Sequence, residues 1–318
     1  MNSIARVESA KSYLIKGFTL IELSIVLVII GLIVGGVLVG QNLITASEVR
    51  ATITQVEKYN TAANTFRSKF GYLPGDINPT AAAQFGFVAR GTNAGQGDGN
   101  GIIEGAGWNG AGANIGTAEA AGETAMFWVD LSSAPGGHLI DGGFNTANPT
   151  TPPGADITGT NINLYLPPAK LGRGNYFYVY SNGYYNGSSW SARGVNYFGL
   201  SAVSNIAAAT VTGRILSSAN IPVAEAYAID KKVDDGMPQT GNVMAFYMNT
   251  DIYWDVWTNG SEYDVTAIIN QPLPTTAAIP SSTTNCYDNN NVTAAPANYS
   301  MEVNGGAGAN CGISFKFQ

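Results

Sequence analysis

The chain is poor in the residues that support metal or nucleophilic chemistry. Of its 318 residues only 12% are charged, two are cysteine (Cys286 and Cys311) and one is histidine (His138). A single histidine cannot build a multi-histidine metal site, and it leaves one imidazole base for any nucleophilic triad. His138 lies in the glycine-rich sequence APGGHLIDGG, where an ordinary loop histidine is the simpler interpretation. There is also no nucleophile elbow or phosphate-binding loop, and no carboxylate spacing that indicates a glycosidase pair, so an enzyme has little support.

Positive charge is scarce as well. The formal net charge is -7. Residues 1–17 contribute +2, from Arg6, Lys11 and Lys16 against Glu8, so the remainder carries -7 - 2 = -9. A surface this acidic repels nucleic acid and anionic lipid, and no nucleic-acid partner is expected. The abundance of glycine (39) and tyrosine (16), with many Asn, Thr and Ser residues, favours an exported, loop-rich β protein over a cytosolic enzyme.

Charge is almost missing from residues 18–40, where Glu22 is the one ionisable side chain. As a helix this segment is about 35 Å long at about 1.5 Å per residue, which is enough to cross a membrane. Basic residues before it predict a cytoplasmic N-terminus and a periplasmic or external C-terminus. The apolar run continues into a polar helix, and Ala46-Ser47 is a poor alternative cleavage site. Trimming is therefore expected before the helix, which keeps the membrane anchor.

The sequence from Gly17 to Glu22, GFTLIE, resembles the cleavage and methylation signature of type IV prepilins and type II secretion pseudopilins. The resemblance continues to Asp76, and a weaker one covers residues 226–241, AYAIDKKVDDGMPQTG. It implies that a membrane aspartyl prepilin peptidase cuts between Gly17 and Phe18 and methylates the new amino group of Phe18. The domains then expected are a leader peptide (1–17), a transmembrane assembly helix (18–40), the amphipathic second half of that helix (41–70) and a globular β-rich head (71–318).

Glu22 is the fifth residue of the trimmed chain. A carboxylate inside a transmembrane helix is costly and usually has a partner. The ammonium group of Phe18, from the same chain or a neighbour, is the obvious candidate, and in the pilin family this pairing is taken to set the register of an incoming subunit. The alternative is a carboxylate that is protonated or extends to the membrane face.

Four glycines lie in the apolar segment at two Gly-xxx-Gly spacings: Gly31, Gly35, Gly36 and Gly40. One interpretation is close helix packing within the membrane. The other is local weakening, since an interior glycine costs about 0.5–1 kcal/mol relative to alanine. Pilin helices often melt in this region when the subunit enters a filament, although proline commonly marks the break and this segment has none.

Beyond the apolar segment, hydrophobic residues recur at three- and four-residue steps: Val49, Ile53, Val56, Ala63, Phe66 and Phe70. The pattern predicts one helix from about Phe18 to Phe70, ended by Gly71 and Pro74. Further helices are expected at 118–131 and 222–233, and strands at 176–180, 195–200, 243–248, 252–257 and 313–317. The fold class expected is α+β and pilin-like, with the long helix packed on an antiparallel head as in a lollipop.

The two cysteines are 25 residues apart near the C-terminus. In an exported domain they predict a disulfide between Cys286 and Cys311, and in the cytosol free thiols; the membrane topology favours the first. A loop of this size stabilises a fold by roughly 3–3.5 kcal/mol in the chain-entropy model. The resemblance agrees, since pilins often close their C-terminal loop in this way.

The aromatic run NYFYVYSNGYYNGSSW alternates around Asn182-Gly183 and predicts a hairpin that turns there. Such a surface could stack sugars or bases. Packing across strands is the commoner explanation.

Two acidic clusters raise the question of calcium. In GQGDGNGIIEG, the residues Asp98, Asn100 and Glu104 match the middle of an EF-hand loop, but glutamine and glycine stand where its first aspartate and closing glutamate belong. A tight glycine turn is the simpler account. The second cluster is Asp230, Asp234 and Asp235 at a predicted helix end, where a cation, or Lys231 and Lys232, could offset the unfavourable dipole.

The function predicted is a structural subunit, without catalysis, of a type IV pilus-like or type II secretion pseudopilus filament. Its expected partners are copies of itself, other pilins or pseudopilins, prepilin peptidase and an inner-membrane assembly platform. The chain would cross the inner membrane once before assembly and then lie in a periplasmic or extracellular filament. The alternative is a minor tip pilin or a membrane-anchored adhesion module. The trimmed length, 318 - 17 = 301 residues, is large for a major pilin, whereas some capping subunits lack the carboxylate that Glu22 supplies.

Overall fold

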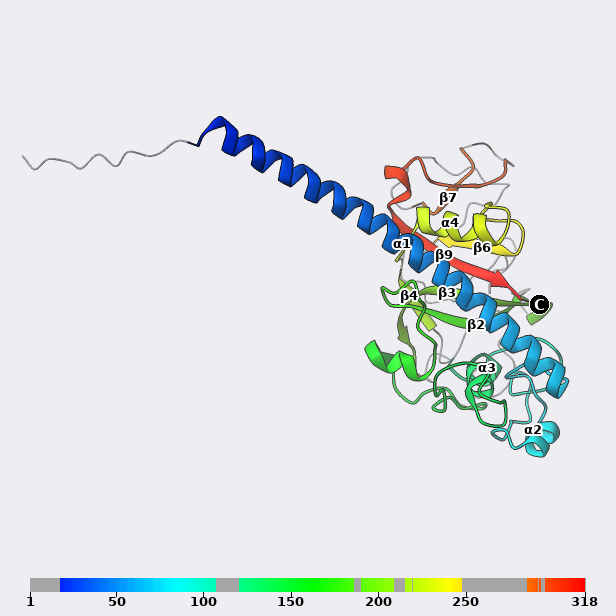
Figure 1. Cartoon of the computed structure of the whole chain (residues 1–318). Coiled ribbons are helices and arrows are strands. Elements are labelled where there is room, and N and C mark those ends of the chain that lie inside the picture. Colours follow the sequence, from blue (N-terminus) through cyan, green and yellow to red (C-terminus); the bar gives the residue numbers. More distant parts are fainter. Residues whose placement is uncertain are drawn as a thin grey trace, which may run out of the picture. The chain divides into compact units, whose positions relative to one another are not determined.

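Helix α1 (Leu20–Phe70) dominates the first part of the chain and confirms the long N-terminal helix (Figure 1). The structure is a computed structural model that describes residues 18–106, 120–185, 190–208, 215–218, 220–247, 285–290, 292 and 295–317. The chain forms two units, Met1–Ala46 and Ser47–Gln318, and α1 contributes to both.

In the first unit, the apolar side chains of α1 have no protein cover. The large apolar side chains from Phe18 to Ile44 are each at least 50% exposed. Within the described ranges, α1 is the one helix that is long and apolar enough to cross a membrane. The helix is continuous through residues 31–40, and melting of that segment in a filament stays a prediction. An apolar surface of this size is consistent with membrane anchoring, because exposing it to water would be energetically unfavourable.

In the second unit, α1 buries one face. Its buried side chains are Val49, Thr52, Val56, Tyr59, Ala62, Ala63, Phe66 and Phe70. The predicted face is confirmed, with two differences: Ile53 is only partly buried, and Thr52, Tyr59 and Ala62 join the face. The helix ends where expected. Gly71 adopts φ +81°, and its N–H donates to the carbonyl of Arg67 at 2.8 Å, a closure that glycine makes without strain.

Among the described residues, an antiparallel sheet of seven strands forms the rest of the second unit's framework. Strand β3 (Trp190–Ile206) pairs with four others, β1 (Ile157–Thr158), β2 (Asn175–Tyr185), β4 (Ile215–Ser218) and β9 (Ala309–Lys316). Strand β9 pairs in turn with β5 (Ile221–Pro222) and β6 (Val243–Tyr247). Strands β7 (Tyr287–Asp288) and β8 (Asn298–Tyr299) form a small separate sheet. The last described strand of the chain therefore lies inside the main sheet.

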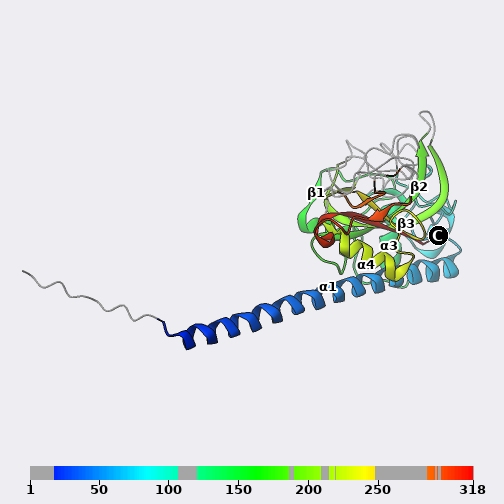
Figure 2. The same cartoon turned by 90° about the horizontal axis from the view of Figure 1, so that it is seen from above.

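The remaining elements are short. They are the helices α2 (Pro79–Phe85), α3 (Gly122–Ser132) and α4 (Val223–Val233). The 3-10 turns η2 (Gly159–Leu164) and η4 (Asn304–Gly306) precede β2 and β9. Helix α4 and the second half of α1 lie on the same side of the sheet (Figure 2). The predicted helices at 118–131 and 222–233 correspond to α3 and α4, and the fold class, α+β, is confirmed.

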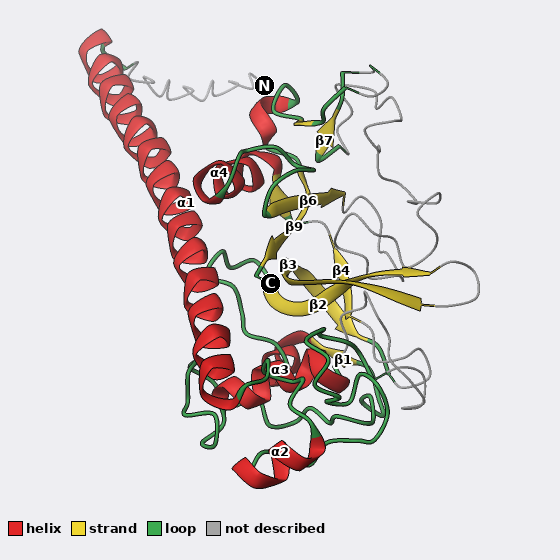
Figure 3. Ribbon diagram, turned by 90° about the vertical axis from the view of Figure 1, so that its right-hand side faces the viewer, coloured by secondary structure: helices red, strands yellow, loops and turns green. Residues whose placement is uncertain are grey.

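Four of the five predicted strands correspond to β2, β3, β6 and β9, although β9 ends one residue earlier than predicted, at Lys316. Residue 248 and the strand predicted at 252–257 lie outside the described residues. The turn predicted at Asn182-Gly183 is wrong. The strand continues to Tyr185, which pairs with Trp190, and the register shifts between Ser181 and Gly183. Strands β2 and β3 therefore project together as a long hairpin arm (Figure 3). Two adjacent tyrosines, Tyr184 and Tyr185, follow the Asn-Gly pair, and aromatic residues favour continued strand pairing.

Aromatic side chains fill the core between α1, α3 and the sheet. Tyr59 of α1 packs edge-on against Trp128 of α3 at 5.0 Å between ring centroids and against Phe177 of β2 at 5.4 Å. Trp128 also contacts Phe198 of β3, at 6.3 Å. Each such pair contributes about 0.5–1.5 kcal/mol beyond burial of its area. All eleven residues of α3 are buried, so this helix is a central element of the core.

Candidate functional site

Thr19 and Glu22 cap the start of α1 reciprocally. The Glu22 Oε2 atom accepts hydrogen bonds from the N–H and the hydroxyl of Thr19, at 2.8 and 2.7 Å. The Glu22 N–H donates to Thr19 Oγ1 at 3.3 Å. This is a capping box, in which Thr-x-x-Glu satisfies helix-start donors that have no partner within the helix. The sequence TLIE carries this signal, and the sequence analysis missed it.

The predicted partner of Glu22 is the amino group of Phe18. In the uncleaved chain that nitrogen belongs to a peptide bond, so the pairing stays a prediction. The cap shows where the carboxylate lies beforehand. It sits at the positive end of the helix dipole, within one turn of the predicted cleavage point.

A second candidate lies in the second unit, where four carboxylates come from three separate segments. Asp76 follows α1, Asp98 and Glu104 belong to the glycine-rich loop, and Glu123 is in the first turn of α3. Oxygen atoms of Asp76, Asp98 and Glu123 all lie within 4.8 Å of one another. We call Asp76, Asp98, Glu104 and Glu123 the four-carboxylate cluster.

The backbone of the loop holds two of these carboxylates in place. The Oδ1 and Oδ2 atoms of Asp76 accept from Gly99 and Gly101 N–H, each at 2.7 Å. The two oxygens of Glu123 accept from the N–H groups of Gly97 and Glu104, at 2.9 and 3.0 Å. Gly97 has φ +96°, and a Cβ there would lie 2.6 Å from the carbonyl oxygen of Ile77, so the close approach requires glycine.

Burial dominates the electrostatics of this cluster. It raises the pKa of Asp76 and of Glu104 to about 7, and neighbouring carboxylates add to both shifts. Burial raises the pKa of Glu123 well above its usual value, with Asp76 and Glu104 as the next causes. Three ionisable groups are thus held where their charged forms are unfavourable.

The ligands predicted from the EF-hand comparison, Asp98, Asn100 and Glu104, do not all have the same role in the structure. Asp98 and Glu104 do lie in the cluster. The Asn100 side chain accepts from Ile102 N–H at 2.7 Å and supports the turn. Asp76 and Glu123 were missed, because nothing in a single sequence connects them to the loop.

The second acidic cluster organises the chain after α4. Asp230, Asp234 and Asp235 lie together as predicted, with oxygens within 4.8 Å. Asp235 Oδ2 accepts from the Thr240 hydroxyl at 2.6 Å, and Asp234 Oδ2 accepts from Val243 N–H at 3.1 Å. These bonds connect the segment after α4 to β6. The cluster therefore has a structural explanation, and calcium there stays a prediction.

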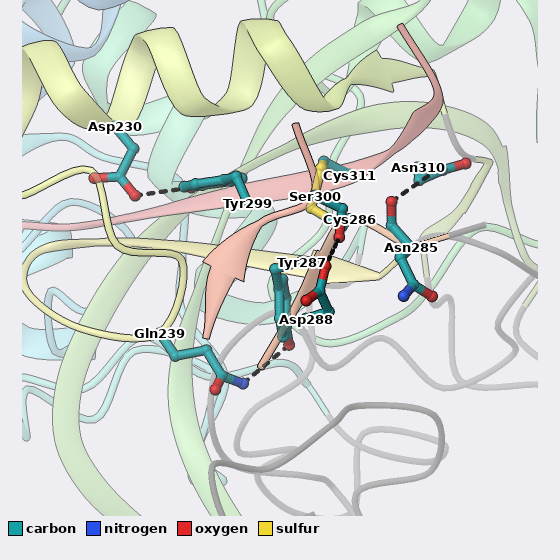
Figure 4. Close-up of a disulfide and its surroundings, with 10 residues drawn as sticks. All are labelled: Asp230, Gln239, Asn285, Cys286, Tyr287, Asp288, Tyr299, Ser300, Asn310 and Cys311. Atoms are coloured by element: carbon teal, nitrogen blue, oxygen red, sulfur yellow. Dashed lines mark hydrogen bonds between the residues drawn. A yellow bond between two sulfur atoms is a disulfide. The ribbon is translucent and has the colours of Figure 1, made fainter. Parts of the chain in front are cut away.

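Asp230 is the buried member of that cluster. Its Oδ2 atom accepts from the Tyr299 hydroxyl at 2.8 Å (Figure 4). Its Oδ1 atom accepts from Gly236 N–H at 3.1 Å. Burial raises the pKa of Asp230 to about 7. Lys231, predicted as a possible neutralising partner, donates instead to the Tyr227 hydroxyl at 3.1 Å.

The predicted disulfide between Cys286 and Cys311 is confirmed, with 5.1 Å between the Cα atoms. It joins the segment before β7 to β9, and Asn310 reinforces the junction by donating to the carbonyl of Asn285 at 3.0 Å (Figure 4). His138 is a loop residue beyond α3, with Nδ1 at 2.7 Å from the carbonyl of Ser132, in keeping with the simpler interpretation.

Comparison with known proteins gives one match. Residues 14–38 match the family model described as the prokaryotic N-terminal methylation motif. That range contains Gly17, Phe18, the Thr19–Glu22 cap and most of the exposed apolar part of α1. No curated protein and no solved structure matches the chain.

Proposed function

From the N-terminal methylation motif, which is the hallmark of type IV pilins and pseudopilins, we infer that this chain is a structural subunit of a type IV pilus-like or type II secretion pseudopilus filament. The observation that carries the proposal is the coincidence of two features. The motif at residues 14–38 overlaps the part of α1 whose apolar side chains have no protein cover. Lipid would cover those side chains before assembly, and neighbouring helices would cover them in a filament.

The proposed mechanism is mechanical. Prepilin peptidase removes residues 1–17 and methylates Phe18, and the subunit then waits in the inner membrane through residues 18–40. Residues 41–70 form the amphipathic half of the helix, and residues 71–318 form the head. An assembly platform extracts the subunit, and its helix joins a bundle. Since lipid and bundle are both apolar, transfer between them changes the hydrophobic free energy little.

Glu22 has a specific role in this proposal. Cleavage would create an ammonium group at Phe18, one residue before the Thr19 cap, and thus close to the carboxylate. Pairing with the ammonium group of the same chain or of a neighbour would neutralise both charges in an apolar surrounding. A neighbour's pairing would fix the register between subunits.

The first experiment is mass spectrometry of the intact protein and its N-terminal peptide, from cells with and without prepilin peptidase. The expected product begins at N-methylated Phe18 only when the peptidase is present. A chain that keeps Met1, or that begins near Ser47, would refute the filament proposal and leave an anchored or secreted binding protein.

The second experiment separates processing from assembly. Glu22→Gln keeps the capping box, because glutamine also fits that position, but it removes the charge. The variant should be cleaved normally and remain in the membrane, yet be missing from sheared filaments. Glu48→Gln is the matched control, since Glu48 lies on the same helix and pairs with Arg173 at 3.3 Å. Incorporation of Glu22→Gln at the wild-type level would contradict the assembly role.

The same filaments decide between major and minor subunits. A subunit that forms the body of the filament should be its most abundant protein by quantitative mass spectrometry. A few copies per filament would instead indicate a minor or tip subunit, whose head would serve recognition.

A further inference from the structure

We propose that Asp76, Asp98, Glu104 and Glu123 bind a calcium ion. Such a site is separate from the proposed assembly role of α1, because all four residues belong to the second unit. It would join three segments that are distant in the sequence: the loop after α1, the glycine-rich loop and the start of α3.

The spacing of the oxygen atoms suits one ion. Calcium takes oxygen ligands at about 2.3–2.6 Å, so two ligands on opposite sides of the ion are roughly 4.6–5.2 Å apart. Oxygens of Asp76, Asp98 and Glu123 lie within 4.8 Å of one another. One ion can therefore contact all three without moving the segments that carry them.

Glu104 provides the independent observation. It is 3% exposed, and its Oε2 atom has no hydrogen-bond partner among the residues that the structure describes. The Glu104 N–H donates to Glu123 Oε2 at 3.0 Å, so this residue lies against the cluster. A buried carboxylate oxygen without a partner is unfavourable, and a cation would supply that partner.

Arg90, a nearby positive charge, does not neutralise the four-carboxylate cluster. The side chain of Arg90 passes close to Gly97, but its Nη2 atom lies 2.6 Å from both carboxylate oxygens of Asp130. Within the described part of the chain, no Lys or Arg forms an ion pair with the four-carboxylate cluster. Ionised carboxylates packed this closely repel one another, and a divalent ion removes that repulsion.

The ligand set favours calcium over other metals. All the donors are oxygens, which suits hard cations and disfavours zinc or copper. The carboxylates are carried by two loops and a helix, and calcium accepts such irregular geometry. Magnesium demands a near-octahedral arrangement at about 2.0–2.1 Å and gives up its waters reluctantly. Asp98 is exposed, so the ion has a path from solvent.

The test uses the full chain in mild detergent, first treated with EGTA. Thermal unfolding is followed with EGTA, with about 10 mM CaCl2, and with the same concentration of MgCl2, well above the roughly 0.1–1 mM dissociation constants of extracellular calcium modules. Calcium should raise Tm by roughly 3–10 °C. Magnesium should raise it less. Terbium luminescence excited through aromatic side chains gives a second readout, because the Tyr72 ring lies against Gly99 beside the cluster.

The diagnostic variant is Asp98→Asn, which changes an exposed residue and keeps its size. It should lose the calcium-dependent rise in Tm and weaken calcium competition against terbium at least about tenfold, the usual effect of removing a charged ligand. In EGTA its Tm should equal or exceed that of the wild type, because a negative charge that repels its neighbours is gone. If Asp98 only supported the turn, the variant would not be less stable than the wild type in calcium and at least as stable in EGTA.

Asp235→Asn is the control, since Asp235 is an exposed member of the second acidic cluster. It should respond to calcium as the wild type does. Three results would overturn the proposal: no calcium effect on the wild type, an undiminished effect in Asp98→Asn, or a loss of the effect in Asp235→Asn instead.

Discussion

Replacing Arg90 by methionine is expected to lower the free energy of unfolding of the second unit by about 3–5 kcal/mol. The Arg90 Nη2 atom lies 2.6 Å from each oxygen of Asp130, and the two side chains are 0% and 1% exposed. Asp130 Oδ2 also accepts from Gly75 N–H at 2.7 Å. The carboxylate thus joins the loop after α1 to α3, and without arginine it would be a buried charge with no counter-ion.

The loss should depend on pH. Burial raises the pKa of Asp130 even beside Arg90, and removing the guanidinium would raise that pKa further. A carboxyl whose folded pKa exceeds its unfolded value, about 3.9, destabilises the fold at higher pH and ceases to do so as pH falls towards that value. The difference between wild type and variant should therefore be smaller at about pH 5 than at about pH 7.5.

Urea unfolding of the full chain in mild detergent, followed by tryptophan fluorescence, measures these differences. Lys58→Met is the matched control, because Lys58 and Asp141 pair at 2.5 Å with side chains that are 48% and 96% exposed, and such surface pairs contribute little. The double variant Arg90→Met/Asp130→Asn should be more stable than Arg90→Met alone, since it buries no charge. If Arg90→Met costs no more than Lys58→Met, or if its cost is the same at both pH values, the reasoning is refuted.

Three further predictions concern the same unit. Replacing Cys286 and Cys311 by serine should lower the free energy of unfolding by roughly 3–3.5 kcal/mol, and a reducing agent should lower Tm in the wild type but not in this variant. Gly75→Ala should reduce Tm more than Gly71→Ala, because both glycines have positive φ but a Cβ at Gly75 would lie 2.3 Å from a carbonyl oxygen of α3, whereas Gly71 faces open space. The pKa of Asp230, raised by burial to about 7, should make the wild type lose stability as pH rises from about 5 to 8, and Asp230→Asn should flatten that part of the Tm profile.

The parts of the fold that the sequence predicted are those with local signals. Helix α1 follows from an apolar run joined to a three- and four-residue periodicity, and its end follows from Gly71. The periodicity did not predict the burial of Thr52 and Tyr59, because both side chains are amphipathic and fit either face of a helix. Thr52 satisfies its hydroxyl within the helix, by donating to the carbonyl of Glu48 at 2.8 Å, so it can be buried without a distant partner.

The features that the sequence did not predict depend on contacts between distant segments. Asp76 and Glu123 are separated by 47 residues, and only the folded chain places both beside Asp98. The EF-hand comparison could not find Asp76 and Glu123 for this reason, since it seeks all ligands within one loop. The Asn-Gly pair at 182–183 was misleading for a different reason. Its turn preference is weaker than the continued pairing of the aromatic strands on either side.

The cap at the start of α1 bears on how Glu22 could serve assembly. In a membrane the first N–H groups of a helix have no water to bind, so a partner for them is as necessary as a partner for the carboxylate. Thr19 and Glu22 meet both needs within one turn.

A neighbour's ammonium group that drew the carboxylate away would expose those N–H groups again. Pairing that keeps the Thr19 contacts avoids this loss, because a carboxylate oxygen can accept from the cap and from an ammonium group together. Thr19→Val, which preserves side-chain shape but removes the hydroxyl, should therefore impair incorporation into filaments, while Thr19→Ser, which keeps the hydroxyl, should not.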